Sequence, residues 1–362
     1  TTVKTEIMAG VTSFMTMAYI LAVNPNILAA AGMDHGAVFT ATAVASFIGT
    51  LCMALFANYP FALAPGMGLN AYFAYTVVLG MGYSWEVALA AVLAEGIIFI
   101  ILSCFNIREA IFNAIPFNLK KAVSVGIGLF ITFLGLQNAK IVIGGATLVG
   151  LFSVDGYNKT LADGLTASMS DAGITVLLAI FGVLITGILI VKNVKGNILW
   201  GILITWILGI ICQFAGIYIP NPDLGFYNLL PDFSNGISIP SLAPIMFKFS
   251  LKGVPVLEFI VIVFAFLFVD LFDTLGTLIG VSAKADMLDS EGRLPRIKGA
   301  LLADAVGTTC GACLGTSTVT TFVESASGVT EGGRTGLTSL TTGILFLLSL
   351  FLSPIFLAIP SF

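Results

Sequence analysis

The sequence predicts an all-α, polytopic membrane protein. The chain has 362 residues, of which 58% are hydrophobic and only 9% are charged, and its mean hydropathy is +1.06. A soluble domain carries about 25% charged residues, so this composition excludes a soluble protein. Its apolar stretches are long enough to cross a bilayer, and two of them are interrupted. Because few charges face water, the formal net charge of −4 indicates no particular partner, and we expect no nucleic acid to bind.

Apolar segments follow one another along the whole chain. We predict spans at 7–31, 36–57, 61–81, 85–105, 118–136, 171–191, 197–217, 255–282, 296–313, 315–328 and 335–358. Two prolines and two glycines in the stretch 60–70 break the third segment, and 315–328 is too short to cross as one helix. Broken spans at corresponding places in two halves are typical of transporter binding sites.

The charged loops indicate how the chain is oriented. With a cytoplasmic N-terminus, eleven of the 15 Lys and Arg residues fall on the cytoplasmic side. Four remain on the other side: Lys140, Lys159, Lys248 and Lys252. Cytoplasmic loops of membrane proteins carry an excess of Lys and Arg. We therefore predict a multi-pass protein of the cytoplasmic (inner) membrane with its N-terminus in the cytoplasm.

The two halves of the chain look related. Each contains a long polar-spotted helix, then a helix of small residues, then a broken segment: 7–31, 36–57 and 61–81 in the first half, 255–282, 296–313 and 315–328 in the second. An odd number of spans in each repeat inverts the second copy in the membrane. The two long segments 137–170 and 218–253 are predicted to lie outside. The first is Gly-rich and polar, and the second is Pro-rich and is predicted to lie along the membrane surface.

The stretch 315–328 is the centre of the predicted site. Its first half is rich in β-branched and hydroxyl residues, which favour extended backbone. Its second half fits a short helix capped by Thr321, with Glu324 three residues on. Backbone that is not helical at this depth must be buried in protein or line a cavity.

The broken segment 61–81 supplies hydrogen-bond donors to the same cavity. We expect an extended stretch that ends at Ala64, with Pro65 at the first helical position. The N–H groups of Gly66–Gly68 then point into the cavity, and Asn70 follows. Two helix N-termini that face each other suit a polar, planar or anionic ligand. Phe322 is available to stack on a flat ring, although an aromatic side chain in a span also serves packing.

No Lys or Arg lies in the middle of a predicted span, whereas five acidic residues are predicted to lie inside the membrane: Glu95, Asp270, Asp273, Asp304 and Glu324. A carboxylate in hydrocarbon is costly, so each is a candidate functional group. With no cation in the spans to pair with, we expect these groups to exchange protons.

Each acid also has a structural interpretation. Asp270 and Asp273 share one helical face and could form a polar seam between helices. Glu324 could serve only as part of the helix cap. Asp304, in a helix of small residues, could brace the broken segment, and Glu95 fits packing as well as function.

Signatures of enzymes are weak in this sequence. Cys310 and Cys313 have a redox spacing but lie in an apolar helix without a basic neighbour. His35 is a lone loop histidine and is not a metal site. No nucleotide-binding or nucleophile motif is present. We predict a carrier rather than an enzyme, with no metal and no cofactor.

Three motifs resemble one family of transporters: APGMGLNAY at 64–72, FVDLFDTLGT at 268–277 and GTSTVTTFVESASG at 315–328. They are similar to the adenine/guanine/hypoxanthine permeases, the AzgA-like branch of the nucleobase–cation symporter-2 (nucleobase/ascorbate transporter) family. The resemblance covers the whole chain.

The resemblance implies a uracil-permease-like fold of fourteen spans in two inverted repeats of seven, with short strands in spans 3 and 10. Residues 1–105 and 255–362 then form a core domain, and 106–254 form half of a gate domain. The eleventh span ends at Phe362, so we expect the natural protein to continue with spans 12–14. The family also implies homodimers that form through the gate.

The resemblance further implies that Asp270 and Glu324 bind a purine, that Asn70 and Asp273 contribute to recognition, and that protons drive uptake. We predict proton-coupled import of purine bases, with H⁺ as the coupling ion. The predicted substrate site is Asp270, Glu324, Asn70, Asp273, Gly68, Phe322, Ser317 and Thr318. The predicted proton carriers are Glu324, Asp270 and Asp304.

Two other functions stay open. A sulfate-type anion carrier of the same architecture would use the helix N-termini, but a cavity lined by Asp270 and Glu324 repels anions. An intramembrane aspartyl protease would need two acids on different helices, and Asp270 with Glu324 meets that condition, yet no Gly-x-Gly-Asp signature is present.

Overall fold

The structure, a computed structural model, describes residues 1–105, 122, 125–126, 129, 132–133, 135–145, 148–161, 164–194, 196–234, 238–288 and 294–360. Most of the predicted span 118–136 lies outside the described residues. So do five of the predicted cytoplasmic charges: Arg108, Lys120, Lys121, Lys195 and Arg293. The chain divides into two compact units, Thr1–Ile127 with Ile237–Ser353, and Gly128–Gly236 with Pro354–Phe362.

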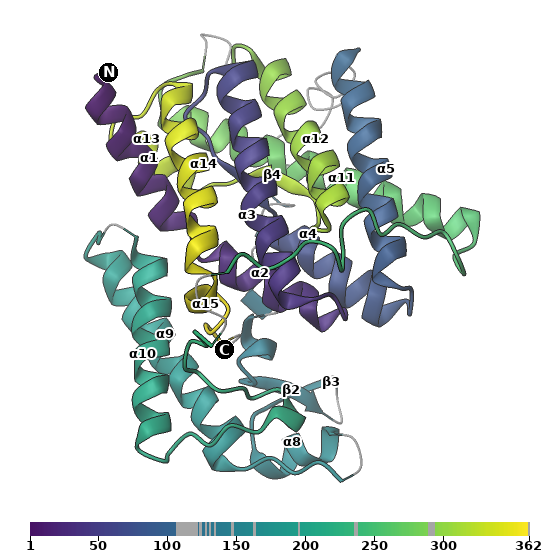
Figure 1. Cartoon of the computed structure of the whole chain (residues 1–362), viewed down its shortest axis with the longest axis vertical. Helices are drawn as coiled ribbons and strands as arrows, with labels where there is room; N and C mark the ends of the chain where they lie inside the picture. Colours follow the sequence, from purple (N-terminus) through teal and green to yellow (C-terminus); the bar gives the residue numbers. More distant parts are fainter. Residues whose placement is uncertain are drawn as a thin grey trace. The chain divides into compact units, whose positions relative to one another are not determined.

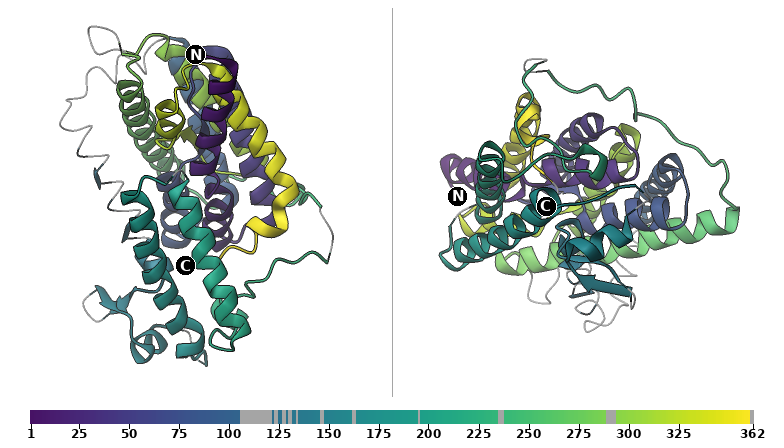
Figure 2. Two further views of the ribbon diagram at one scale, coloured as in Figure 1. Left: turned by 90° about the vertical axis from the view of Figure 1, so that its left-hand side faces the viewer. Right: turned by 90° about the horizontal axis from the view of Figure 1, so that it is seen from below.

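The first unit is almost entirely helical. Its helices are α1 (Val3–Met17), α2 (Ile20–Ala30), α3 (His35–Cys52), α4 (Met67–Ala71), α5 (Trp85–Cys104), α11 (Val256–Lys284), α12 (Ile297–Leu314), α13 (Ser325–Thr330) and α14 (Gly336–Leu348) (Figures 1 and 2). The π-helical segments η1 (Met53–Ala57) and η2 (Tyr72–Gly80) continue α3 and α4. The short η5 (Ser349–Leu352) and α15 (Ser353–Phe356) follow α14.

These helices confirm the prediction of a mostly helical, polytopic protein. Among the described residues, seven helices are long and apolar enough to cross a membrane, starting with Val3–Ala30. The helix α11 reaches 29 residues and carries both Asp270 and Asp273. The inverted relation of the two halves stays a prediction.

Local chemistry sets where several helices begin. The Asp34 carboxylate accepts a hydrogen bond from the Ala37 N–H (2.7 Å) at the start of α3. At the start of α14, the Thr335 hydroxyl accepts from the Leu337 N–H (3.3 Å). The buried Glu6 of α1 also accepts from the Thr335 N–H (3.2 Å), which ties α1 to the start of α14.

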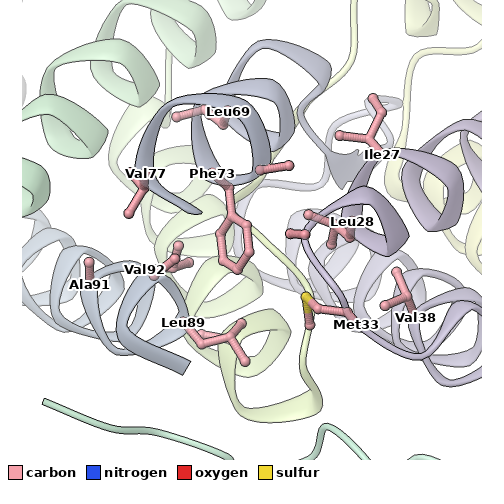
Figure 3. Packing of buried hydrophobic residues seen from close by; sticks show 14 of the residues in the cluster. Ile27, Leu28, Met33, Val38, Leu69, Phe73, Val77, Leu89, Ala91 and Val92 are labelled. Carbon is pink, nitrogen blue, oxygen red and sulfur yellow. The ribbon is translucent and has the colours of Figure 1, made fainter. Parts of the chain in front are cut away.

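Two groups of contacts hold the first unit together. The helix α12 packs against α3 and α5, while α14 packs against α1 and α3. One apolar cluster draws side chains from α2, α3, η2 and α5, and Leu28, Phe73 and Leu89 meet near its middle (Figure 3). The helices that carry the broken spans are therefore held by buried apolar contacts on the sides away from their polar residues.

The second unit contains a β-hairpin and further helices. Strands β2 (Val142–Gly145) and β3 (Leu148–Leu151) pair antiparallel, with Val142 opposite Leu151. The other elements are α8 (Val154–Thr160), η3 (Met169–Gly173), α9 (Ile174–Val191), α10 (Asn197–Phe214) and η4 (Pro222–Leu224). The predicted outside segment 137–170 contains the hairpin and α8. In the predicted outside segment 218–253, the described residues contain the short η4. The place of both segments outside the membrane stays a prediction.

Candidate functional site

The two broken spans meet in a pair of short antiparallel strands. Strand β1 (Leu63–Pro65) pairs with β4 (Val319–Thr321), so that Ala64 lies opposite Thr320. All residues of both strands are buried. The pairing is extended at both ends, where the Gly66 N–H donates to the Thr318 carbonyl and the Phe322 N–H donates to the Ala62 carbonyl, both at 3.0 Å. Each strand thereby satisfies backbone groups of the other at a depth where water is scarce.

Two details of the predicted strand–helix junctions were wrong. Pro65 is the last residue of β1 rather than the first of a helix, and α4 begins after Gly66. The fixed φ of proline suits the extended strand, and its missing N–H costs nothing there because Gly66 donates in its place. As a result, the Gly66 N–H is occupied by the strand pairing and does not point into a cavity.

The predicted helix cap was also wrong. The helix α13 begins after Glu324, whose side chain makes no cap hydrogen bond, and Thr321 belongs to β4. The hydroxyl of Thr321 has no hydrogen-bond partner among the described residues. The Glu324 carboxylate is therefore not used as a cap, which removes the structural interpretation given to it.

The Glu324 carboxylate is bound by a tyrosine from the start of the chain. The Tyr19 hydroxyl donates to Glu324 Oε1 at 2.7 Å. Tyr19 occupies the break between α1 and α2 and is buried, whereas Glu324 is partly exposed. One oxygen of this carboxylate is thus fixed by the Tyr19 hydroxyl.

Asp273 is the second partly exposed carboxylate at this place. Its Oδ2 lies 3.5 Å from where a side chain on Gly66 would begin, and no described residue donates a hydrogen bond to it. It is close enough to Asp304 and Glu324 for their charges to interact. Asp273 and Glu324 therefore lie beside the strand crossing with acceptor oxygens left for a ligand.

Asp270 has a different environment, although it lies one turn from Asp273 on α11. The Thr274 hydroxyl lies 3.0 Å from Asp270 Oδ1, 3.0 Å from Asp304 Oδ2 and 2.8 Å from the Thr320 hydroxyl of β4. All four residues are buried. The network connects α11, α12 and the strand crossing through one hydroxyl group.

Several of the remaining predicted site residues form hydrogen-bonded pairs. Asn70 accepts from the Ser317 hydroxyl, and the Thr318 hydroxyl donates to Glu95 Oε2 at 2.7 Å. Asn70, Glu95, Ser317 and Thr318 are fully buried, Phe322 is buried, and Gly68 is partly exposed. Their contribution to substrate binding stays a prediction.

Sequence reasoning missed two residues of this site. Thr274 follows Asp270 by four residues, a spacing that places the two side chains together on a helix and could have indicated the contact. Tyr19 gave no signal, because an aromatic residue in an apolar segment ordinarily serves packing. Only the fold brings Tyr19 to Glu324, 305 residues away.

The arrangement is that of a carrier site. A model described as "Permease family", that of the xanthine/uracil permeases, matches residues 4–362 of the chain. The chain belongs to the xanthine/uracil permease family. This permease is thus a multi-pass membrane protein, as its composition predicted, and the predicted resemblance is confirmed.

Several curated proteins are similar to this permease over its full length. A putative permease of Methanocaldococcus jannaschii is 50% identical over 363 residues, which cover 100% of this chain and 76% of that protein. The guanine/hypoxanthine permease PbuG of Bacillus subtilis is 44% identical, with 100% and 78% covered. The adenine permease AdeP of Escherichia coli is 40% identical, with 100% and 74% covered.

Solved structures share the fold of this permease at low sequence identity. The transmembrane domain of BicA, a cyanobacterial bicarbonate transporter, has a TM-score of 0.69 at 14% identity and covers 99% of this chain and 85% of that chain. Murine Slc26a9, an anion transporter in its inward-facing state, has a TM-score of 0.59 at 8% identity, with 99% and 58% covered. At such identities the likeness concerns the fold alone.

Proposed function

We propose that this permease carries purine nucleobases across the cell membrane and that protons drive uptake. The observation that carries the proposal is the placement of Asp273 and Glu324, two partly exposed carboxylates, beside the crossing of two broken spans. The relatives named as adenine and guanine/hypoxanthine permeases support a purine as the substrate. A purine presents N–H groups along its edges, and carboxylate oxygens accept hydrogen bonds from such donors.

The buried network next to the site supports coupling to protons. The Thr274 hydroxyl has one proton and can donate to only one carboxylate, yet it lies 3.0 Å from both Asp270 and Asp304. If both acids were ionised, one contact would bring together two oxygens without a hydrogen. The distances suit a state in which Asp270 and Asp304 share one proton, with the protonated acid donating to Thr274. We assign this shared proton to the coupling step.

The mechanism follows from the two groups of acids. Asp273 and Glu324 accept N–H groups of the base, with Asn70, Gly68, Phe322, Ser317 and Thr318 shaping the site around them. Asp270 and Asp304 hold the proton one helical turn away. We assign release of this proton toward the cytoplasm to the step in which the base also leaves the site.

The test is uptake of radiolabelled hypoxanthine, guanine and adenine into proteoliposomes with an imposed proton gradient. We expect the wild-type protein to accumulate at least one base, a protonophore to abolish accumulation, and replacement of Na⁺ by K⁺ to have no effect. In Glu324→Gln the carboxylate acceptor becomes an amide, and we expect uptake to fall by about 100-fold, the loss of a hydrogen bond to a charged group. Undiminished uptake by this variant would contradict the role of Glu324.

A carrier of inorganic anions is the weaker alternative. The likeness to bicarbonate and anion transporters concerns the fold, at 14% and 8% identity. Four carboxyl groups gather at or beside the site of this chain: Asp270, Asp273, Asp304 and Glu324. The negative charges of such a site repel an anion, and dissolved salt screens charges that are buried in protein only weakly. Inhibition of uptake by sulfate but not by purines would favour this alternative.

A further inference from the structure

We propose that Tyr19 is a positioning residue that sets the acceptor oxygen of Glu324 and thereby the affinity of the site for a base. The inference rests on the proposed function, since it concerns how the same site recognises its substrate. None of the three sequence motifs contains Tyr19. It is identified by its contact with Glu324 alone, at 2.7 Å between the hydroxyl and Oε1.

Tyr19 lies between two helices of the first unit. The helices α1 and α2 are separate elements, and Tyr19 is the residue immediately before α2. At this break its side chain is buried, with 4% of its surface exposed. A buried hydroxyl needs a hydrogen-bond partner, and the carboxylate of Glu324 supplies it.

Helix α1 also holds the backbone on which Glu324 lies. The Thr16 hydroxyl reaches the Glu324 carbonyl at 3.4 Å. One turn further into α13, Gly328 lies against α1 so closely that a Cβ there would come within 2.6 Å of the Ala9 carbonyl. The two helices lie next to each other in the first unit (Figure 1). Tyr19 therefore acts from a rigid support rather than from a free loop.

The hydrogen bond distinguishes the two oxygens of Glu324. Oε1 accepts the Tyr19 hydroxyl, so Oε2 keeps more of the acceptor capacity that a ligand or a proton can use. The charge of Asp273 also lies within electrostatic reach of the Tyr19 hydroxyl. Without the hydroxyl, the carboxylate can rotate and offer either oxygen, and the site loses its defined arrangement of acceptors.

The test compares Tyr19→Phe with the wild-type protein. We expect the KM for hypoxanthine and the Kd of the purified protein to rise about 10-fold or more, which is the range for a lost hydrogen bond to a charged group. We expect Vmax, expression and the Tm of the protein without substrate to stay unchanged. A residue with a purely structural role would instead lower Vmax and Tm and leave KM unchanged.

A matched control lies on the same helix. Within the described residues, the Thr12 hydroxyl donates to the Met8 carbonyl of α1, so we expect the KM of Thr12→Val to stay within twofold of wild type. If Tyr19→Phe lowers the Tm, a variant with 4-aminophenylalanine at position 19 restores an N–H donor at the same place. Recovery of the KM by this variant supports the proposal.

Two results overturn the proposal without touching the proposed function. One is a KM for Tyr19→Phe within twofold of wild type. The other is a KM that rises equally with phenylalanine and with 4-aminophenylalanine at position 19. Failure of the proposed function has a different signature, because the wild-type protein would then bind no purine at all.

Discussion

At the scale of single residues, the acids of this permease divide by their exposure. Asp273 and Glu324 are partly exposed, whereas Asp270 and Asp304 are fully buried around Thr274. The sequence groups Asp270 with Glu324 as the purine-binding pair, and that assignment stays a prediction. In the function proposed above, Asp273 and Glu324 accept the base, and Asp270 and Asp304 hold a proton.

We expect that removal of the Thr274 hydroxyl, which lies between Asp270 and Asp304, separates substrate binding from proton coupling. Thr274→Val keeps the shape of the side chain but deletes a hydroxyl that contacts both Asp270 and Asp304. We expect exchange of labelled for unlabelled hypoxanthine to continue, while accumulation driven by a proton gradient falls at least 10-fold. Both are measured in proteoliposomes.

Thr309→Val is the control for this prediction, because the Thr309 hydroxyl donates only to the Ala305 carbonyl of its own helix. We expect it to transport like the wild-type protein. Equal loss of exchange and of accumulation in Thr274→Val would mean that Thr274 supports the fold of the site and not the coupling.

At the scale of elements, the site depends on the close approach of β1 and β4. Gly66 follows β1, and a Cβ at this position would lie 2.6 Å from Cγ2 of Thr320 and 3.5 Å from Oδ2 of Asp273. The first distance is shorter than any ordinary contact between carbon atoms, so the strands can pair at this register only when residue 66 is glycine.

Gly66→Ala tests this requirement. Overpacking at a buried contact costs about 1–3 kcal/mol, and here it acts on the strand pairing itself. We expect the Tm to fall and purine binding to be lost. The double variant Gly66→Ala with Thr320→Ser removes the clashing methyl group and keeps the hydroxyl that contacts Thr274, so we expect binding to return in part.

Gly280→Ala is the matched control on α11, because a Cβ there meets no atom within 4 Å. We expect it to bind purines normally. Unimpaired binding by Gly66→Ala would show that the crossing tolerates a wider spacing than the structure has.

At the scale of the whole molecule, segments from the two halves of the chain build one site. The Ala62 N–H donates to the hydroxyl of Ser325, 263 residues away, at 2.9 Å. Asn24 of α2 likewise donates to Thr316 of the second half. The second half supplies the acids of the site, and the first half supplies Tyr19 and strand β1. We therefore expect the site to form only when both halves are folded together.

The orientation of the chain in the membrane can be tested directly. The excess of Lys and Arg on one side predicts that the N-terminus lies in the cytoplasm. In a variant without the five native cysteines, we expect Lys159→Cys to react with a membrane-impermeant maleimide in intact cells. Lys4→Cys should react only after the membrane is permeabilised. Both side chains are exposed, so the membrane alone decides access; the reverse pattern would invert the orientation.

The dimer is a second proposal at this scale. We infer from the family that two copies associate through the gate domain. Mass measurement of the purified protein in nanodiscs distinguishes one copy from two, and a single copy that still transports purines would contradict the proposal.

The sequence by itself determined where the helices lie and which acidic residues are candidates for the site. The ends of α3, α5 and α12 lie within a few residues of the predicted spans, because apolar length and end signals are local properties. It also indicated that two broken spans carry the site, since prolines, glycines and lone acids are visible without a fold. Only the tertiary structure decided which of these acids are partly exposed and which residues they contact. Asp270 and Asp273 share a face by spacing, but only the packing of α12 and β4 against that face turns one acid toward Thr274 and leaves the other beside Glu324 and Tyr19.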